Sequence, residues 1–196
     1  MSIYDRIGGD FDNYRSGVGA SDVVGLVHEM GAGLRVLDLG CGTGHPIAVS
    51  VAPLVSRYLG IDNSAPMLAA FRRNVPEAES RLIDMTQLEN VGGEWDIIFS
   101  WGAICHLPVS GQCATLVAAT HLLKTGGRLL FTGGPEPGRA KGSVGPHVNV
   151  IDHFSMGKSG YDDLLTANGM TQVWAEQREA ENFTYHYRKD TAKRSQ

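Results

Sequence analysis

The sequence predicts an α/β fold: a seven-stranded, mostly parallel sheet with helices on both faces and an antiparallel hairpin strand near the C-terminus. Two observations predict it. Short apolar segments typical of buried strands alternate with segments of helical periodicity, and this alternation is characteristic of a parallel sheet. Around residue 180, two strand-like segments follow each other with only a turn between them, which predicts the antiparallel hairpin.

The first half of the chain contains four of the expected strands and three helices. Short, mostly apolar stretches predict strands at 35–39, 57–61, 80–83 and 95–99. Apolar residues on one side of a helical pattern predict helices at 21–30, 46–55 and 65–74. Ser21 and Ser64 stand where the first and third of these helices need a capping side chain.

The second half continues the alternation and ends differently. Helices are expected at 110–123 and 160–168, and the first of them should end at the glycines of 124–127. Strands are expected at 128–132, 171–176 and 182–188. In the last strand, large aromatic residues alternate with polar ones, which is the two-residue period of a strand with two unlike faces. The glycine- and proline-rich segment 133–146 follows neither period, so we expect it to be irregular.

The chain is expected to form one domain, because its 196 residues suit a single core and no linker divides them. We divide it into an N-terminal lid and helix, a ligand-binding core, a pocket loop, and a C-terminal helix with hairpin (1–33, 34–132, 133–160 and 161–196). Cys41, Cys105 and Cys113 show no CxxC spacing, so we expect neither a disulfide scaffold nor a zinc site.

Charge and hydropathy exclude some partners. The net charge of −4 offers no attraction to nucleic acid or to anionic membranes. No apolar stretch approaches the roughly 20 residues that span a bilayer, and no secretory signal is recognisable. We therefore expect a cytoplasmic protein, monomeric or homodimeric, that contacts neither nucleic acid nor membrane.

The glycine-rich turn after the first strand is the sharpest feature of the sequence. Gly40, Gly42 and Gly44 let a ligand approach the backbone, since no Cβ atom stands in the way. Dinucleotide folds use the spacing G-x-G-x-x-G at this turn, whereas this chain has G-x-G-x-G. Asp38 precedes the turn, and a carboxylate there suits a cationic ammonium group and disfavours a diphosphate.

Two further acids follow the next two strands. Asp62 comes at the end of the second strand, where a carboxylate can accept both ribose hydroxyls of an adenosine. Asp84 comes at the end of the third strand. Because ligands bind at the carboxyl ends of strands in open α/β folds, Asp38, Asp62 and Asp84 are expected to converge on one ligand.

The segment from Val36 to Gly44 resembles motif I of the class I S-adenosylmethionine-dependent methyltransferases of small-molecule type, and the similarity continues through most of the chain. The resemblance implies a Rossmann-like domain that binds S-adenosyl-L-methionine and transfers its methyl group to a small molecule, at nitrogen or oxygen. The residues it implies at the cofactor are Tyr14, Asp38, Gly40, Cys41, Gly42, Gly44, Asp62, Asn63, Met67, Asp84, Met85, Ser100 and Trp101. Met67 and Trp101 are equally suited to the core.

The acceptor side is less clearly marked. We expect the pocket loop to overhang the strand ends, and His147, His153 and His106, in that order, are the candidate general bases. Tyr4, Phe11 and Tyr14 resemble the lid-forming lead of the family. The histidines lack the spacing of metal ligands, so we expect no metal.

Two alternatives of other classes remain open. A nicotinamide-dependent oxidoreductase would carry G-x-G-x-x-G and a catalytic Tyr-x-x-x-Lys pair, and the sequence contains neither. A non-catalytic protein that binds an adenosine ligand as a regulator or partner would have the same core, because the acceptor side of this family has no fixed signature.

Overall fold

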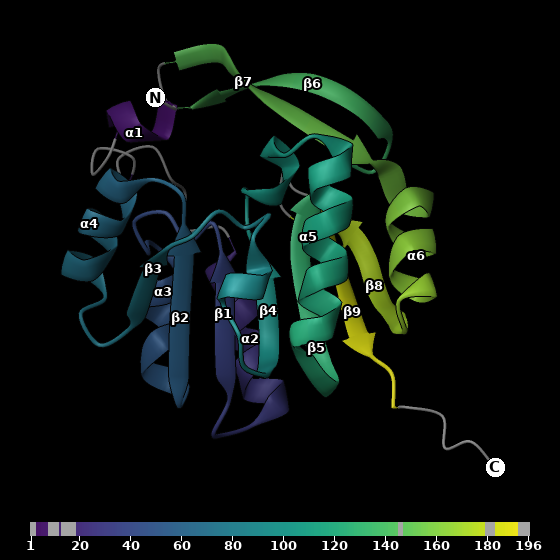
Figure 1. Ribbon diagram of the computed structural model, residues 1–196, viewed down its shortest axis with the longest axis horizontal. Coiled ribbons are helices and arrows are strands. Elements are labelled where there is room, and N and C mark those ends of the chain that lie inside the picture. Colours follow the sequence, from purple (N-terminus) through teal and green to yellow (C-terminus); the bar gives the residue numbers. More distant parts are fainter. Residues whose placement is uncertain (1–2, 8–11, 13–18, 145–146, 179–182, 192–196) are drawn as a thin grey trace.

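The computed structural model describes residues 3–7, 12, 19–144, 147–178 and 183–191. Within them, a central sheet lies between two layers of helices (Figure 1). Its strands are ordered β3-β2-β1-β4-β5-β9-β8. They are β1 (Arg35–Leu39), β2 (Arg57–Asp62), β3 (Glu79–Leu82), β4 (Trp95–Ser100), β5 (Leu123–Gly133), β8 (Met170–Gln177) and β9 (Phe183–Lys189).

The predicted topology of the sheet is confirmed. β1 to β5 pair in parallel, whereas β9 pairs antiparallel with both β5 and β8. The four parallel pairings place the carboxyl ends of these strands at the same edge of the sheet. Any side chain that follows one of these strands is therefore brought to that edge.

Helices cover both faces of the sheet, as expected. One face packs against α2 (Ala20–Met30), α3 (Ile47–Val51) and α4 (Ala65–Asn74), and the other against α5 (Val109–Leu122) and α6 (Gly157–Ala167). Alternate residues of β1 serve the two layers, since Val36 packs in the first and Leu37 in the second. Within the described ranges, no helix is long and apolar enough to cross a membrane.

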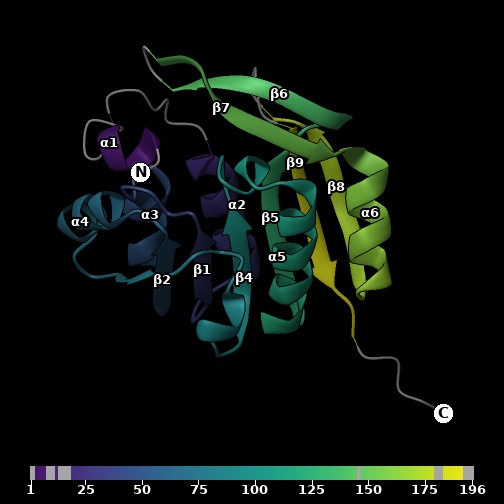
Figure 2. The same cartoon turned by 45° about the horizontal axis from the view of Figure 1, so that its top comes forward.

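The expectation of an irregular segment at 133–146 was wrong. β6 (Pro137–Val144) and β7 (His147–Met156) form a separate two-stranded antiparallel sheet. Nearly all of β6 is exposed, so its side chains carry no burial pattern that a sequence could reveal, and backbone pairing with β7 makes the strand. Figure 2 shows this hairpin arching above the edge where the parallel strands end.

Several predicted element ends also shift. Gly19 stands at the N-cap of α2 in place of Ser21, and Ser64 makes no capping hydrogen bond at α4. The helix expected at 46–55 ends at Val51 and continues as the 3-10 turn η2 (Ala52–Leu54), because Pro53 has no amide hydrogen to donate. β5 begins at Leu123, where the preceding helix was expected to end in a glycine cap. Its pairing with β4 shifts register across the segment that contains the glycines, between Leu123 and Arg128.

His186 of β9 is a buried polar group on the α2 side of the sheet. Its side chain is 3% exposed, and neither ring nitrogen has a hydrogen-bond partner among the described residues. The ring of Trp174 packs against it edge to face at 5.1 Å. Burial lowers the pKa of His186 to about 4. The charges of Arg128 and Arg178 also lower this pKa, whereas the charge of Glu29 raises it.

The fold is therefore expected to lose stability as the pH falls below neutrality. The unfolded chain binds a proton at His186 near pH 6.5, whereas the folded chain binds it only near pH 4. The contribution of His186 is thus fully present above pH 6.5 and is lost as the pH falls toward 4. Between about pH 7 and about pH 5 the loss amounts to about 2 kcal/mol.

Urea unfolding of His186→Phe and of the wild type at these two pH values checks this expectation. The variant should lose about 2 kcal/mol less than the wild type over the interval. His121→Phe, at an exposed position of α5, is the control. Parallel pH profiles for the wild type and His186→Phe would contradict it.

Candidate active site

One pocket of about 580 Å³ opens at the edge where the parallel strands end. Its floor comes from the turns after β1 to β4, and α1 (Ile3–Ile7) and β7 approach from above (Figure 2). The lining residues are Ile3, Tyr4, Arg6, Gly40, Gly42, Ile61, Asp62, Asn63, Met67, Ile83, Asp84, Met85, Gly102, Ala103, His106, Leu107, Pro108, Val150, Ile151, Asp152 and Phe154.

The glycine turn is tied to the end of β2 by its own backbone. The amides of Gly40 and Cys41 both donate to the carbonyl of Ile61, at 2.8 and 3.0 Å. Gly40 has φ +78°, and a Cβ atom there would lie 2.4 Å from the Cβ of Ala103. At Gly42, with φ +55°, a Cβ atom would meet nothing within 4 Å, so the backbone borders open space.

Asp62 is held rigidly at the end of β2. One carboxylate oxygen accepts a hydrogen bond from the amide of Gly42 at 2.9 Å, and the other from the amide of Ser64 at 2.8 Å. Burial raises the pKa of Asp62, and these backbone hydrogen bonds oppose the rise. The result is an oriented acceptor in the pocket wall with lone pairs left for a ligand.

Asp84 lies two residues beyond β3 and forms a second oriented acceptor. Its carboxylate accepts from the amide and the hydroxyl of Thr86, at 2.9 and 2.7 Å, and from the side-chain amide of Asn63 at 3.3 Å. Burial alone would raise the pKa of Asp84, but these hydrogen bonds outweigh it and the pKa falls. Asp84 is therefore ionised at neutral pH.

His106 lies at the other end of the pocket, in the 3-10 turn η4 (Ile104–His106). Its Nδ1 is 3.3 Å from the backbone carbonyl of Asp152, and its Nε2 is 2.8 Å from the hydroxyl of Tyr4. α1 and β7 thus both contact the same imidazole. The carboxylate of Asp152 is engaged by Arg139 and Lys141, whose hydrogen bonds lower its pKa to about 2.

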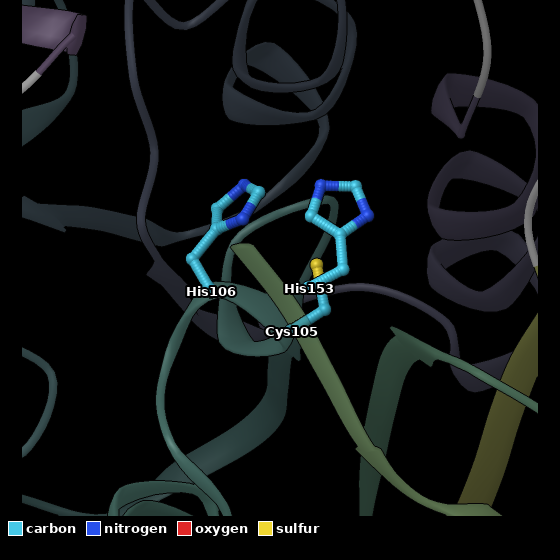
Figure 3. Close-up of side chains that lie close together, drawn as sticks. All are labelled: Cys105, His106 and His153. Atoms are coloured by element: carbon cyan, nitrogen blue, oxygen red, sulfur yellow. The ribbon is translucent and has the colours of Figure 1, made fainter. Parts of the chain in front are cut away.

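Figure 3 shows the rings of His106 and His153 side by side, with the sulfur of Cys105 nearby. The ring centroids are 4.8 Å apart, and each of the three residues offers a potential ligand atom within 4.8 Å of the others. Burial lowers the pKa of His153 against the charge of Asp152, which favours a neutral ring. Both nitrogens of His106, however, already have hydrogen-bond partners.

The core of this chain matches a known family. Residues 36–127, which contain the glycine turn, Asp62 and Asp84, match the family model described as a methyltransferase domain. This part of the chain is therefore similar to methyltransferase domains.

One curated relative is named as a methyltransferase. Trans-aconitate 2-methyltransferase of Methylobacterium nodulans is 29% identical, and the match covers 79% of this chain and 64% of that enzyme. This chain therefore spans less than two thirds of the length of this curated relative.

Solved structures share the fold at lower identity. The CcbJ methyltransferase from Streptomyces caelestis superposes with a TM-score of 0.77 and 19% identity, over 97% of this chain and 99% of that one. Magnesium protoporphyrin IX methyltransferase from Synechocystis PCC 6803 was crystallised with bound S-adenosylmethionine. It superposes with a TM-score of 0.69 and 18% identity, over 97% of this chain and 85% of that one.

The pocket contains seven of the thirteen residues expected at the cofactor. They line one end of it together: Gly40, Gly42, Asp62, Asn63, Met67, Asp84 and Met85. They come from the turns after β1, β2 and β3 and from the first part of α4. Of the three acids that the sequence predicted to converge on the ligand, Asp62 and Asp84 line the pocket and Asp38 does not.

The pocket lining does not include five others, namely Asp38, Cys41, Gly44, Ser100 and Trp101. The carboxylate of Asp38 is buried and accepts a hydrogen bond from the hydroxyl of Tyr58 at 2.7 Å. Ser100 connects two strand ends, because its hydroxyl donates to the carbonyl of Leu39 and accepts from the amide of Ile104. Trp101 packs in the core against Gly19. Tyr14 lies outside the described residues, as does Phe11.

The candidate bases are placed differently from their predicted order. His106 lines the pocket, and His153 reaches it only through its contact with His106. His147 is exposed at the start of β7 and is absent from the lining. Sequence reasoning expected the segment 133–160 to border the acceptor but did not single out Val150 and Ile151 of β7, which line the pocket with Phe154. Recognising 147–156 as a strand would have pointed to them.

Proposed function

We propose that this chain transfers a methyl group from S-adenosylmethionine to a small-molecule acceptor. The observation that carries the proposal is one pocket with two unlike ends. Asp84, Asp62 and Gly42 follow β3, β2 and β1 along the sheet edge, and His106 follows β4 on the other side of β1, beside the apolar residues of β7. A cofactor and an acceptor that enter from the two ends would meet between them.

The residues at the first end fit an adenosyl group. The open space at Gly42 admits a ligand against the backbone, where a side chain would exclude it. Asp62 would accept the ribose hydroxyls, and Asp84 with the Met85 amide would meet the adenine. S-adenosylmethionine supplies an activated methyl group, so the work of the protein is to orient the two reactants and exclude water.

Orientation accounts for most of the expected acceleration. Holding two reactants in line contributes up to roughly 7–11 kcal/mol to lowering a barrier. A general base adds on the order of 10²–10⁴-fold when the acceptor must lose a proton. We assign that role to His106 rather than to His147 or His153, because His106 alone of these three lines the pocket.

The relatives support a small acceptor. Their names include a trans-aconitate and a magnesium protoporphyrin IX methyltransferase, both of which act on small molecules. The net charge of −4 gives no attraction to nucleic acid. We further propose a cytoplasmic protein, monomeric or homodimeric.

Calorimetry with S-adenosylmethionine, S-adenosylhomocysteine and NAD tests the cofactor. We expect both adenosyl sulfur compounds to bind and NAD to show no measurable heat. Mass spectrometry of an acceptor panel then tests transfer. NAD binding in their place would support an oxidoreductase, and S-adenosylmethionine binding with no transfer to any acceptor would support the non-catalytic alternative.

A further inference from the structure

We propose that the acceptor is a small aromatic compound with an acidic hydroxyl, which takes the place of the Tyr4 hydroxyl at Nε2 of His106. This inference rests on the proposed function and names its acceptor class. Three observations carry it: the tautomer of His106, the phenol that is hydrogen-bonded to its Nε2, and the apolar wall beside it.

Hydrogen bonding determines the tautomer of His106. A backbone carbonyl can only accept, so the contact of Nδ1 with the carbonyl of Asp152 requires the proton on Nδ1. In the neutral ring, Nε2 then carries a lone pair, and the Tyr4 hydroxyl 2.8 Å away donates to it. His106 therefore presents a proton acceptor to the pocket, held in place by β7.

The group at this acceptor is itself a phenol. Tyr4 belongs to α1, which approaches the pocket from above, while His106 belongs to the floor. The Tyr4 and His106 rings lie 5.7 Å apart at 47°. A phenol of the acceptor that replaced this side chain would find the same lone pair at the same distance. Tyr4 thus marks the position and the chemistry of an acceptor hydroxyl.

The surroundings suit an aromatic ring. Leu107 and Pro108 follow His106 directly, and Val150, Ile151 and Phe154 face the pocket from β7. Burying an aromatic ring against these side chains is favourable by roughly 25 cal/mol per Å² of apolar surface removed from water. Arg6 also lines the pocket, and an acceptor with a carboxylate would pair with it, so the experiment includes that class.

The proposed step is balanced within these groups. The acceptor hydroxyl passes its proton to Nε2 of His106, and the Asp152 carbonyl stabilises the resulting imidazolium through Nδ1–H. The acceptor oxygen forms a bond to the methyl carbon while the carbon–sulfur bond breaks and its electron pair remains on sulfur. The products are a methyl ether, S-adenosylhomocysteine and a proton that His106 later releases to water.

Four probes of the same shape test the acceptor class: 4-methylphenol, 4-methylaniline, 4-methylbenzoate and 4-methylbenzenethiol. We expect kcat/KM for 4-methylphenol to exceed the others at least about tenfold. Faster transfer to any other probe, or none to 4-methylphenol, overturns the inference. S-adenosylhomocysteine affinity is measured in parallel, because its absence means that the proposed function itself has failed.

Acceptor acidity tests the role of His106. His106→Gln should lower kcat with 4-methylphenol by about 10²–10⁴-fold, since this phenol stays protonated near neutral pH. With 4-nitrophenol at about pH 8.5, where this probe is already ionised, the loss should stay below about tenfold. Equal losses with both phenols, or no loss with either, would overturn the assignment.

Two further variants keep the test independent of folding. Tyr4→Phe removes the hydroxyl that competes with the acceptor for Nε2, so KM for 4-methylphenol should fall. A fall in kcat with KM unchanged would mean that Tyr4 takes part in the chemistry, which contradicts its role as a stand-in. His28→Gln, at an exposed position of α2, is the control for a histidine exchange away from the pocket.

Discussion

Replacing Asp62 by alanine is expected to weaken S-adenosylhomocysteine binding at least about 100-fold. Hydrogen bonds to a charged group contribute about 1.5–3 kcal/mol each, and the carboxylate would lose two of them to the ribose. The variant also leaves the amides of Gly42 and Ser64 without their acceptor, so the glycine turn loses one of its hydrogen bonds to β2 and keeps the backbone bonds to Ile61. Calorimetry at matched protein concentration measures the change in affinity.

Asp190→Ala provides the matched control. Asp190 is an exposed carboxylate beyond β9, bonded to Thr171 and absent from the pocket lining. Its removal should leave the affinity within about twofold of the wild type. Unchanged affinity in Asp62→Ala would show that the carboxylate at the end of β2 does not hold the nucleoside.

Gly40→Ala is expected to lower the free energy of unfolding by about 2–5 kcal/mol. A side chain at φ +78° costs about 1–2 kcal/mol. The added Cβ would also lie 2.4 Å from the Cβ of Ala103 and 3.0 Å from the Cε of Met85, and such overpacking costs about 1–3 kcal/mol. Because Ala103 and Met85 both line the pocket, cofactor affinity should fall as well.

Gly126→Ala separates the two causes. Gly126 has the same φ of +78°, but a Cβ atom there would meet nothing within 4 Å. Urea unfolding should therefore give only the backbone cost of about 1–2 kcal/mol at Gly126. Equal free energies of unfolding for the two variants would show that the close approach of Gly40 to Ala103 adds no cost to the substitution.

The centre of the parallel core could be predicted because β1, β2 and β4 are buried on both faces. Such strands are short apolar runs between helices, and this pattern is local. Asp62 was found for the same reason, since a polar residue at the end of an apolar strand is visible without any tertiary information. The position of Asp38 in the same pattern did not reveal that Tyr58 would cover it.

The acceptor side could not be predicted to the same extent. β6 is almost fully exposed, so no hydrophobic period marked it, and the register of β7 depended on backbone pairing with it. His147 ranked first among the bases on sequence grounds, yet the hairpin leaves it exposed and brings Asp152 to His106 in its place.

The amino-acid sequence by itself determined the parallel core, the glycine turn and the acids that follow the strands. Each of these features depends on a pattern of neighbouring residues, which is visible in the sequence alone. Only the tertiary structure decided which groups surround His106. Tyr4 is 102 positions away and Asp152 is 46. Contacts of this range depend on how the lid helix and the hairpin lie over the sheet edge, and no local pattern encodes that geometry.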